Sequence, residues 1–427
     1  MKFIILTQGC KVNRCDSDTI SASMIYKGFT VAKNGDIPDI VIVNTCTVTE
    51  NGDKKAKRLI SKLRRDYPAA IIAVTGCYPQ AFPEEAALND CADIVTGNSE
   101  NLNLPALISE YIRKKEKTVR ISPHENVFRE PERFASSDMT RAFIKIEDGC
   151  DRFCSYCIIP KARGRIRSRR LESIAEERDF HARDGHKEIV LTGINLSCYG
   201  SDIRLSLFDA IKTAADNPLI ERVRLSSLEP ELLTPEGIEK MSRIKKLCPH
   251  FHLSLQSGCD ETLKRMNRRY TSDEYAKIVG NLRSAFPGCA VTTDIMVGFA
   301  GETDEEFERS LSFAKETGFA RIHVFTYSVR PGTAAASMPN QIPEEIKERR
   351  YQAMNRLSIS AQQDFFAKNM NAVQKVLIER RTSPEYINGY TENYIPVRIY
   401  GGNAAKHDIV NVRLTDAGEN FCTGVIV

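Results

Sequence analysis

The N-terminal third of the chain alternates short apolar runs with longer stretches of mixed polarity. Apolar runs rich in β-branched residues cover residues 3–6, 40–43 and 71–74, and each is followed by a polar turn and a helical stretch. Uniformly apolar strands that alternate with helices are typical of a parallel sheet covered on both faces. We therefore predict an α/β domain with a parallel sheet over residues 1–135.

The same alternation of strand and helix repeats in the middle of the chain. The expected strands are residues 142–146, 188–192, 222–226, 251–255, 291–297 and 321–325. Six parallel βα units form an incomplete barrel, whose functional residues are expected at the carboxyl ends of its strands. Residues 344–368 carry apolar positions at helical spacing and predict a long helix that packs on this barrel. The second predicted domain therefore covers residues 136–368.

After this helix the pattern changes to short strands. They are expected near residues 373–379, 386–390, 394–399, 409–414 and 424–427, and predict a small OB-like β-barrel over residues 369–427. Small barrels of this kind often bind RNA. Basic and aromatic side chains that could contact phosphates or stack on bases are Arg380, Arg381, Tyr390, Tyr394 and Arg398, although an aromatic residue on a strand more often packs in an interior.

Composition narrows the class of protein. A length of 427 residues is enough for three domains, each with its own core. The net charge of +4 is far milder than that of proteins that coat nucleic acid and identifies no partner. The first residues lack the length and cleavage site of a signal peptide, and no apolar run is long enough to span a membrane. We expect a cytoplasmic protein whose 13 cysteines include metal ligands rather than disulfides.

Cys150, Cys154 and Cys157 form a CxxxCxxC motif directly after the first barrel strand. Three thiolates can bind three irons of a 4Fe-4S cluster and leave the fourth iron open. An open iron can chelate S-adenosylmethionine (SAM), and an electron passed to the sulfonium then cleaves it to an adenosyl radical, so we assign these cysteines to catalysis. The alternative is a zinc knuckle, which needs a fourth ligand that this loop does not provide.

Each N-terminal strand is followed within four residues by a cysteine, namely Cys10, Cys46 and Cys77. Parallel strands share a carboxyl edge, so the three thiols are expected at one rim of the sheet. They form a candidate metal site. The alternative is three unrelated buried cysteines, since free cysteine is often buried.

Polar residues also follow the barrel strands. Glycine lets a backbone approach a ligand closely, and serine, asparagine, glutamine and glutamate side chains can bind ribose and amino-acid groups. We expect SAM contacts from Gly193, Asn195, Ser226, Glu229 and Gln256.

The whole chain, with its two cysteine trios and its small C-terminal β domain, resembles the radical SAM methylthiotransferase family. The resemblance implies an auxiliary 4Fe-4S cluster held by Cys10, Cys46 and Cys77, a second cluster held by the CxxxCxxC cysteines, and a C-terminal TRAM domain that contacts RNA. The motifs at residues 9–13, 191–195 and 389–394 are most similar to the branch that modifies N6-threonylcarbamoyladenosine next to the anticodon of tRNA.

By this resemblance one SAM molecule methylates a sulfur on the auxiliary cluster and another yields the radical that activates C2 of the adenine. The implied partners are tRNA, a reducing electron donor and a sulfur source, with neither a membrane nor DNA. Cations that follow the cluster loop are expected to bind tRNA phosphates, namely Arg163, Arg165, Arg167 and Arg169, unless one of them forms a buried ion pair.

Three other functions fit the same residues. Two are methylthiotransferases acting on isopentenyladenosine in tRNA or on a ribosomal-protein aspartate. The third, of a different class, is a non-catalytic iron–sulfur protein that binds RNA or senses redox state. Such a protein would not cleave SAM.

Overall fold

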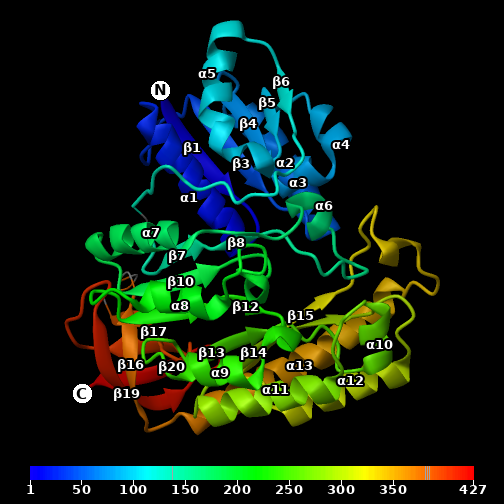
Figure 1. Cartoon of the computed structure of the whole chain (residues 1–427), viewed down its shortest axis with the longest axis vertical. Helices are drawn as coiled ribbons and strands as arrows, with labels where there is room; N and C mark the ends of the chain where they lie inside the picture. The colour runs from blue at the N-terminus through cyan, green and yellow to red at the C-terminus, as the bar shows by residue number, and fades with distance from the viewer. Residues whose placement is uncertain (137, 380, 382, 384) are drawn as a thin grey trace.

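The computed structural model describes residues 1–136, 138–379, 381, 383 and 385–427. Figure 1 shows an N-terminal α/β domain in blue and cyan above a larger βα region in green and yellow, with a small β-barrel in red at the lower left. The three regions follow the order that the sequence pattern predicts. The α/β fold, the partial barrel and the C-terminal β-barrel are thereby confirmed.

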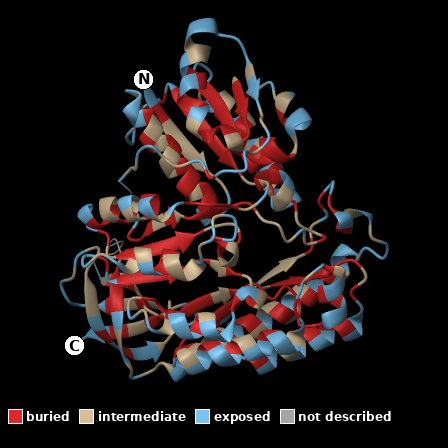
Figure 2. Cartoon of the chain, viewed as in Figure 1, coloured by how far each residue is buried: buried red, intermediate tan, exposed pale blue. Residues whose placement is uncertain are grey.

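The N-terminal sheet is parallel throughout, with strand order β2-β1-β3-β4-β5-β6. Every residue of β3 and β4 is buried because helices cover both faces, as the interior in Figure 2 shows. The predicted strands match β1, β3 and β4. The elements are β1 (Lys2–Thr7), α1 (Lys11–Tyr26), β2 (Thr30–Val31), β3 (Ile40–Thr45), α2 (Glu50–Asp66), β4 (Ile71–Gly76), α3 (Cys77–Ala81), α4 (Pro83–Ala87), β5 (Ile94–Thr96), η1 (Asn98–Asn103), α5 (Leu104–Lys114) and β6 (Thr118–Arg120).

The middle region contains all six predicted strands, arranged as two sheets of order β11-β10-β7 and β12-β13-β14-β15. Its strands and helices are β7 (Ala142–Lys145), β8 (Glu147–Asp148), α6 (Ile159–Arg163), β9 (Arg167–Ser168), α7 (Leu171–Arg183), β10 (Glu188–Thr192), η2 (Leu196–Cys198), α8 (Leu207–Ala215), β11 (Arg222–Leu225), β12 (Ser227–Leu228), η3 (Pro230–Leu232), α9 (Pro235–Ser242), β13 (His250–Leu253), α10 (Asp260–Arg265), α11 (Ser272–Ala285), β14 (Ala290–Val297), α12 (Asp304–Thr317), β15 (Arg321–Thr326) and η4 (Ala334–Ser337).

The strand expected over residues 222–226 corresponds to β11, which ends at Leu225, and a second short strand, β12, follows at Ser227. The backbone N–H of Ser226 donates to Leu191 of β10, whereas Ser227 already pairs with His252 of β13. The chain therefore changes its hydrogen-bonding partner at Ser226.

Helix α13 (Glu344–Lys368) has the predicted bounds and joins the barrel to the C-terminal domain. Ser358 Oγ donates to the Ile322 carbonyl on β15 at 2.7 Å, which holds the helix against the barrel. The last five strands close into a barrel of order β16-β17-β18-β20-β19, as predicted: β16 (Val373–Ile378), β17 (Tyr386–Thr391), β18 (Pro396–Tyr400), β19 (Ile409–Ala417) and β20 (Cys422–Ile426). Among the described residues, no helix is long and apolar enough to cross a membrane.

Candidate active site

The structure brings the three N-terminal cysteines together at the carboxyl rim of the sheet. Gly9 has a φ of +102°, and a Cβ there would lie 2.7 Å from Cys46 Cβ, so the first cysteine loop lies against the second. The thiols of Cys10 and Cys77 both donate to Asn13 Oδ1, at 3.8 and 3.7 Å. The rim therefore gathers the cysteines that the sequence places far apart.

A buried cation adjoins this trio. Arg163 is 1% exposed, and its Nε donates to Cys77 Sγ at 3.2 Å while Nη2 donates to Asn13 Oδ1 at 2.6 Å. Burial raises the pKa of the Cys77 thiol to about 12, and the Arg163 charge opposes that rise. Because a metal ligand must be a thiolate, the guanidinium favours the ligating form of Cys77.

The second trio lies on the loop after β8. Gly149 has a φ of +88°, and a Cβ there would lie 1.9 Å from the Arg165 carbonyl oxygen, so glycine is required directly before Cys150. Ser155 fixes the middle of the loop, since its N–H donates to the Met266 carbonyl and its Oγ to the Arg265 carbonyl. The barrel thus holds the loop directly after its central cysteine, Cys154.

A buried arginine also adjoins this second trio. Arg268 Nη1 donates to Cys154 Sγ at 3.3 Å, and Arg268 Nη2 donates to Glu229 Oε2 at 2.5 Å. Glu229 therefore contacts the cysteine loop through Arg268, whose guanidinium it holds beside Cys154. Each trio thus has one arginine in contact with a thiol.

The chemistry of each trio is compatible with an iron–sulfur cluster. Three thiolates can bind three irons of a 4Fe-4S cube and leave the fourth iron open, whereas a structural zinc site needs four ligands. The CxxxCxxC loop offers three cysteines and no fourth.

Three of the expected SAM contacts carry buried polar atoms that have no hydrogen-bond partner within the described part of the chain. These atoms are Asn195 Oδ1, Ser226 Oγ and Gln256 Oε1. Asn195 Nδ2 donates to Cys150 Sγ at 3.7 Å, so this set adjoins the CxxxCxxC loop. Buried polar atoms without a partner call for an explanation, and a polar ligand at the strand ends provides one.

Gly193, also an expected SAM contact, is glycine because a neighbouring side chain occupies the space of a Cβ. A Cβ at Gly193 would lie 2.6 Å from Glu147 Oε2, which accepts the backbone N–H of Asn195 at 2.8 Å. Gly193 thus makes room for a side chain of this protein. Sequence reasoning missed Glu147, although an acidic residue directly after an apolar strand and before the cysteine loop was a usable signal.

Three of the four arginines expected to bind tRNA phosphates are buried in the structure. Arg163, Arg167 and Arg169 are 1%, 5% and 1% exposed. Their guanidinium groups contact residues of this chain, for example Arg163 with Asp16, Arg167 with the Arg165 carbonyl, and Arg169 with Glu130. Arg165 is exposed, lies over the Phe153 ring and pairs with Asp151.

The expected base-stacking residues of the C-terminal barrel also pack internally. Tyr390 and Tyr394 stack on each other with ring centroids 4.8 Å apart, and the guanidinium of Arg141 lies over both rings. Arg398 lies over the Phe421 ring at 3.8 Å. Arg381 is exposed, and Arg380 lies outside the described residues.

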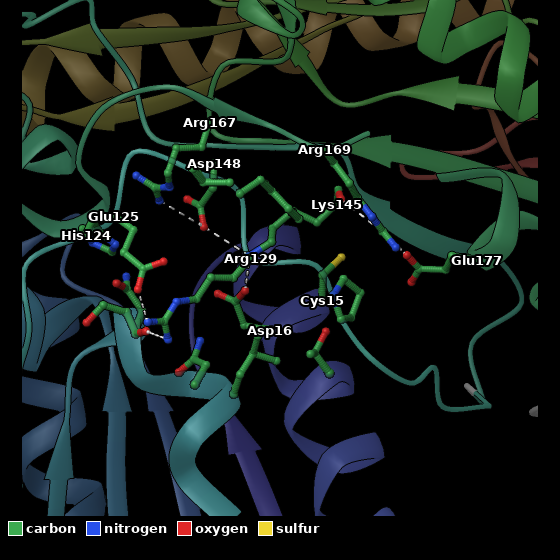
Figure 3. A pocket seen from close by; sticks show the side chains of 18 of the residues that line it. Cys15, Asp16, His124, Glu125, Arg129, Lys145, Asp148, Arg167, Arg169 and Glu177 are labelled. Carbon is green, nitrogen blue, oxygen red and sulfur yellow. Dashed lines mark hydrogen bonds and ion pairs between the residues drawn. The ribbon is translucent and has the colours of Figure 1, made fainter. Parts of the chain in front are cut away.

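A cavity of about 80 Å³ lies between the N-terminal domain and the barrel, next to the N-terminal trio. Figure 3 shows Asp16, Lys145 and Asp148 directed toward it. Lys145 Nζ bridges these two carboxylates at 2.5 and 3.1 Å. Asn98, which also lines it, donates to Cys77 Sγ at 3.7 Å.

Family models match three parts of the chain. They are the Radical SAM superfamily over residues 144–314, Uncharacterized protein family UPF0004 over residues 2–97, and the TRAM domain over residues 368–427. Among solved structures, the radical SAM methyltransferase TsrM from Kitasatospora setae is 16% identical with a TM-score of 0.58, covering 78% of this chain and 75% of its own. That likeness confirms the fold.

Curated relatives match over the full length. The threonylcarbamoyladenosine tRNA methylthiotransferase MtaB of Bacillus subtilis is 37% identical, covering 99% of this chain and 95% of its own, and that of Aquifex aeolicus is 36% identical, covering 94% and 97%. A tRNA-2-methylthio-N(6)-dimethylallyladenosine synthase of Pelotomaculum thermopropionicum is 34% identical, covering 100% and 97%. With this full-length identity and a radical SAM domain that carries the CxxxCxxC loop, the chain belongs to the radical SAM tRNA methylthiotransferase family.

Proposed function

We propose that this enzyme transfers a methylthio group to C2 of N6-threonylcarbamoyladenosine, next to the anticodon of tRNA. It would do so with two 4Fe-4S clusters and SAM, in the cytoplasm. The two relatives of highest identity cited above carry names that specify this substrate. Its partners would be tRNA, an electron donor and a sulfur source.

The observation that carries the proposal is the link between the two cysteine sites through Arg163. Its Nε contacts Cys77 Sγ in the N-terminal domain, and its Nη1 donates at 3.1 Å to Asp148, two residues before Cys150. Sulfur insertion needs a sulfur-bearing centre near a radical generator. One buried side chain that contacts both loops fits that need.

The residues at the barrel end would hold the SAM molecule. When bound, a 4Fe-4S cluster with an open iron supplies the electron that cleaves the SAM sulfonium. Asn195, Ser226 and Gln256 offer the unpartnered polar atoms that would orient SAM beside the CxxxCxxC loop. Arg268 pairs with Glu229 and contacts Cys154, and would stabilise the thiolate form of that ligand.

Nucleoside mass spectrometry tests the substrate. tRNA from cells that lack this protein should contain N6-threonylcarbamoyladenosine without its 2-methylthio derivative, and expression of the intact chain should restore the derivative. A Cys154→Ala chain is the matched control and should not restore it. Restoration of 2-methylthio-isopentenyladenosine instead, or of a methylthiolated ribosomal protein, would replace the proposed substrate.

A further inference from the structure

A cluster of histidines lies where helix α7 ends, away from both cysteine trios. His181 is in the last turn of α7, Asp184 directly follows the helix, and His186 precedes β10. Both histidines are buried, and the three residues each offer a ligand atom within 4.8 Å of the other two. This spacing suits a single metal ion.

The contacts of His186 determine which of its ring nitrogens can bind a metal ion. Its Nε2 lies 3.1 Å from the Met139 carbonyl oxygen, and because a carbonyl can only accept, Nε2 carries the proton of the neutral ring. Nδ1 then holds a lone pair. This buried atom has no hydrogen-bond partner within the described residues and lies 3.6 Å from Asp184 Oδ2. Two electron-pair donors thus face each other across a gap that suits a cation.

His181 shows the same arrangement. Its Nε2 faces the carboxylate of Glu177 at 3.7 Å, and its buried Nδ1 has no hydrogen-bond partner among the described residues. Histidines that bind metals typically direct one nitrogen to the ion and donate the other N–H to a carboxylate or a backbone carbonyl. Glu177 and the Met139 carbonyl provide these two kinds of outer contact.

We propose that His181, Asp184 and His186 bind one divalent transition-metal ion, for which Zn²⁺ is the best fit. Two imidazoles and a carboxylate are a set that zinc accepts, and zinc completes four-coordination with one further ligand. His407 lies outside this group of three mutually close ligand atoms but packs against His186, and it would move closer to provide that ligand. Its ring centroid lies 5.1 Å from that of His186, and its buried Nδ1 also has no hydrogen-bond partner in the described parts of the chain.

This ion would join two domains. His407 belongs to the loop between β18 and β19 of the C-terminal barrel, whereas the other three ligands follow or end α7 of the radical SAM region. Lys406 Nζ already donates to the Asp138 carbonyl at 2.8 Å, which places this loop against the segment before β7. The metal would therefore fasten the C-terminal barrel to the SAM-binding region.

The test is zinc binding by full-length, cluster-loaded protein. After equilibrium dialysis against micromolar Zn²⁺, inductively coupled plasma mass spectrometry should find about one zinc ion per chain in addition to the iron of the clusters. Asp184→Asn should weaken zinc binding at least tenfold, with iron content unchanged. Asp184 is exposed, so this variant should fold. Asp216, which follows α8 as Asp184 follows α7, provides the matched control, and Asp216→Asn should bind zinc as the parent does.

X-ray absorption at the zinc edge identifies the ligands. Nitrogen and oxygen neighbours near 2.0–2.1 Å without sulfur near 2.3 Å are expected for this site. Sulfur neighbours would place the zinc at the cysteines and overturn the proposal, as would equal zinc binding by the parent and Asp184→Asn. His407→Gln should reduce the zinc-dependent rise in Tm. An undiminished rise would remove His407 from the ligand set.

Discussion

Arg163 Nε lies 3.2 Å from Cys77 Sγ, although the two residues are 86 positions apart in the chain. The same guanidinium pairs through Nη1 with Asp16 of α1 at 2.7 Å and with Asp148 of β8 at 3.1 Å. One buried cation therefore compensates two carboxylates from different domains while it contacts a cysteine of the N-terminal site. Its loss would break both of these buried ion pairs and leave Lys145 Nζ, which also contacts Asp16 and Asp148, as the nearest cation to two buried carboxylates.

Arg163→Met should lower the free energy of unfolding by about 3–5 kcal/mol, the usual cost of breaking a buried ion pair by removing one partner. Chemical denaturation followed by circular dichroism measures it. Arg165→Met is the matched control, since that arginine is exposed, and it should change stability by less than about 0.5 kcal/mol. Equal stability of the two variants would show that Arg163 does not join the domains.

Cys46→Ala should leave about four of the roughly eight irons that two cubes require. SAM cleavage under dithionite should survive, because the CxxxCxxC loop lies in the other domain. Iron analysis and chromatography of 5'-deoxyadenosine measure the two quantities. Loss of SAM cleavage in a variant that retains a cluster would contradict this division of roles.

Cys154→Ala should abolish the formation of 5'-deoxyadenosine, because two thiolates do not hold a cluster in position to bind SAM. The N-terminal cluster should remain visible by electron paramagnetic resonance. Cys198→Ala is a suitable control, since that cysteine belongs to neither trio. Undiminished cleavage in the Cys154 variant would move the SAM site elsewhere.

The sequence predicts those parts of the fold and of the site that depend on patterns of neighbouring residues. Buried strands and the turns that end them are recognisable from neighbouring residues, so the loops that carry Cys10, Cys46 and Cys77 could be placed at one rim. The burial of Arg163, Arg167 and Arg169 could not be predicted in the same way, because some of their partners come from distant segments. Arg163 pairs with Asp16, which is 147 positions away in the chain, and a pattern of neighbouring residues cannot predict such a contact. The change of hydrogen-bonding partner at Ser226 likewise depends on neighbours from two different sheets.

Glu147 should make stability depend on pH. Burial raises the pKa of its carboxyl well above the usual value. The folded state then retains a proton that the unfolded chain loses above about pH 4.3, so the free energy of unfolding falls by up to about 1.4 kcal/mol per pH unit until the folded-state pKa is reached.

Glu147→Gln removes this titration while keeping an oxygen for the Asn195 N–H. The variant should become more stable relative to the parent as the pH rises from 5 to 8, and denaturation at several pH values measures the difference. Parallel stability profiles of the two proteins would show that Glu147 is already ionised in the folded state.

Arg165 is the member of the arginine run that remains available to tRNA phosphates. Arg165→Ala should lower tRNA affinity and reduce the log–log slope of affinity against salt by about one, as expected for one lost phosphate contact. Filter binding at several salt concentrations measures both. Arg170→Ala is a matched control, since Arg170 is also exposed and also pairs with a carboxylate, that of Glu130, but it directly precedes α7, whereas Arg165 lies over Phe153 of the CxxxCxxC loop. Its salt slope should equal that of the parent, because the phosphate contact is expected at the CxxxCxxC loop. An unchanged slope for Arg165→Ala would place the tRNA surface away from the CxxxCxxC loop.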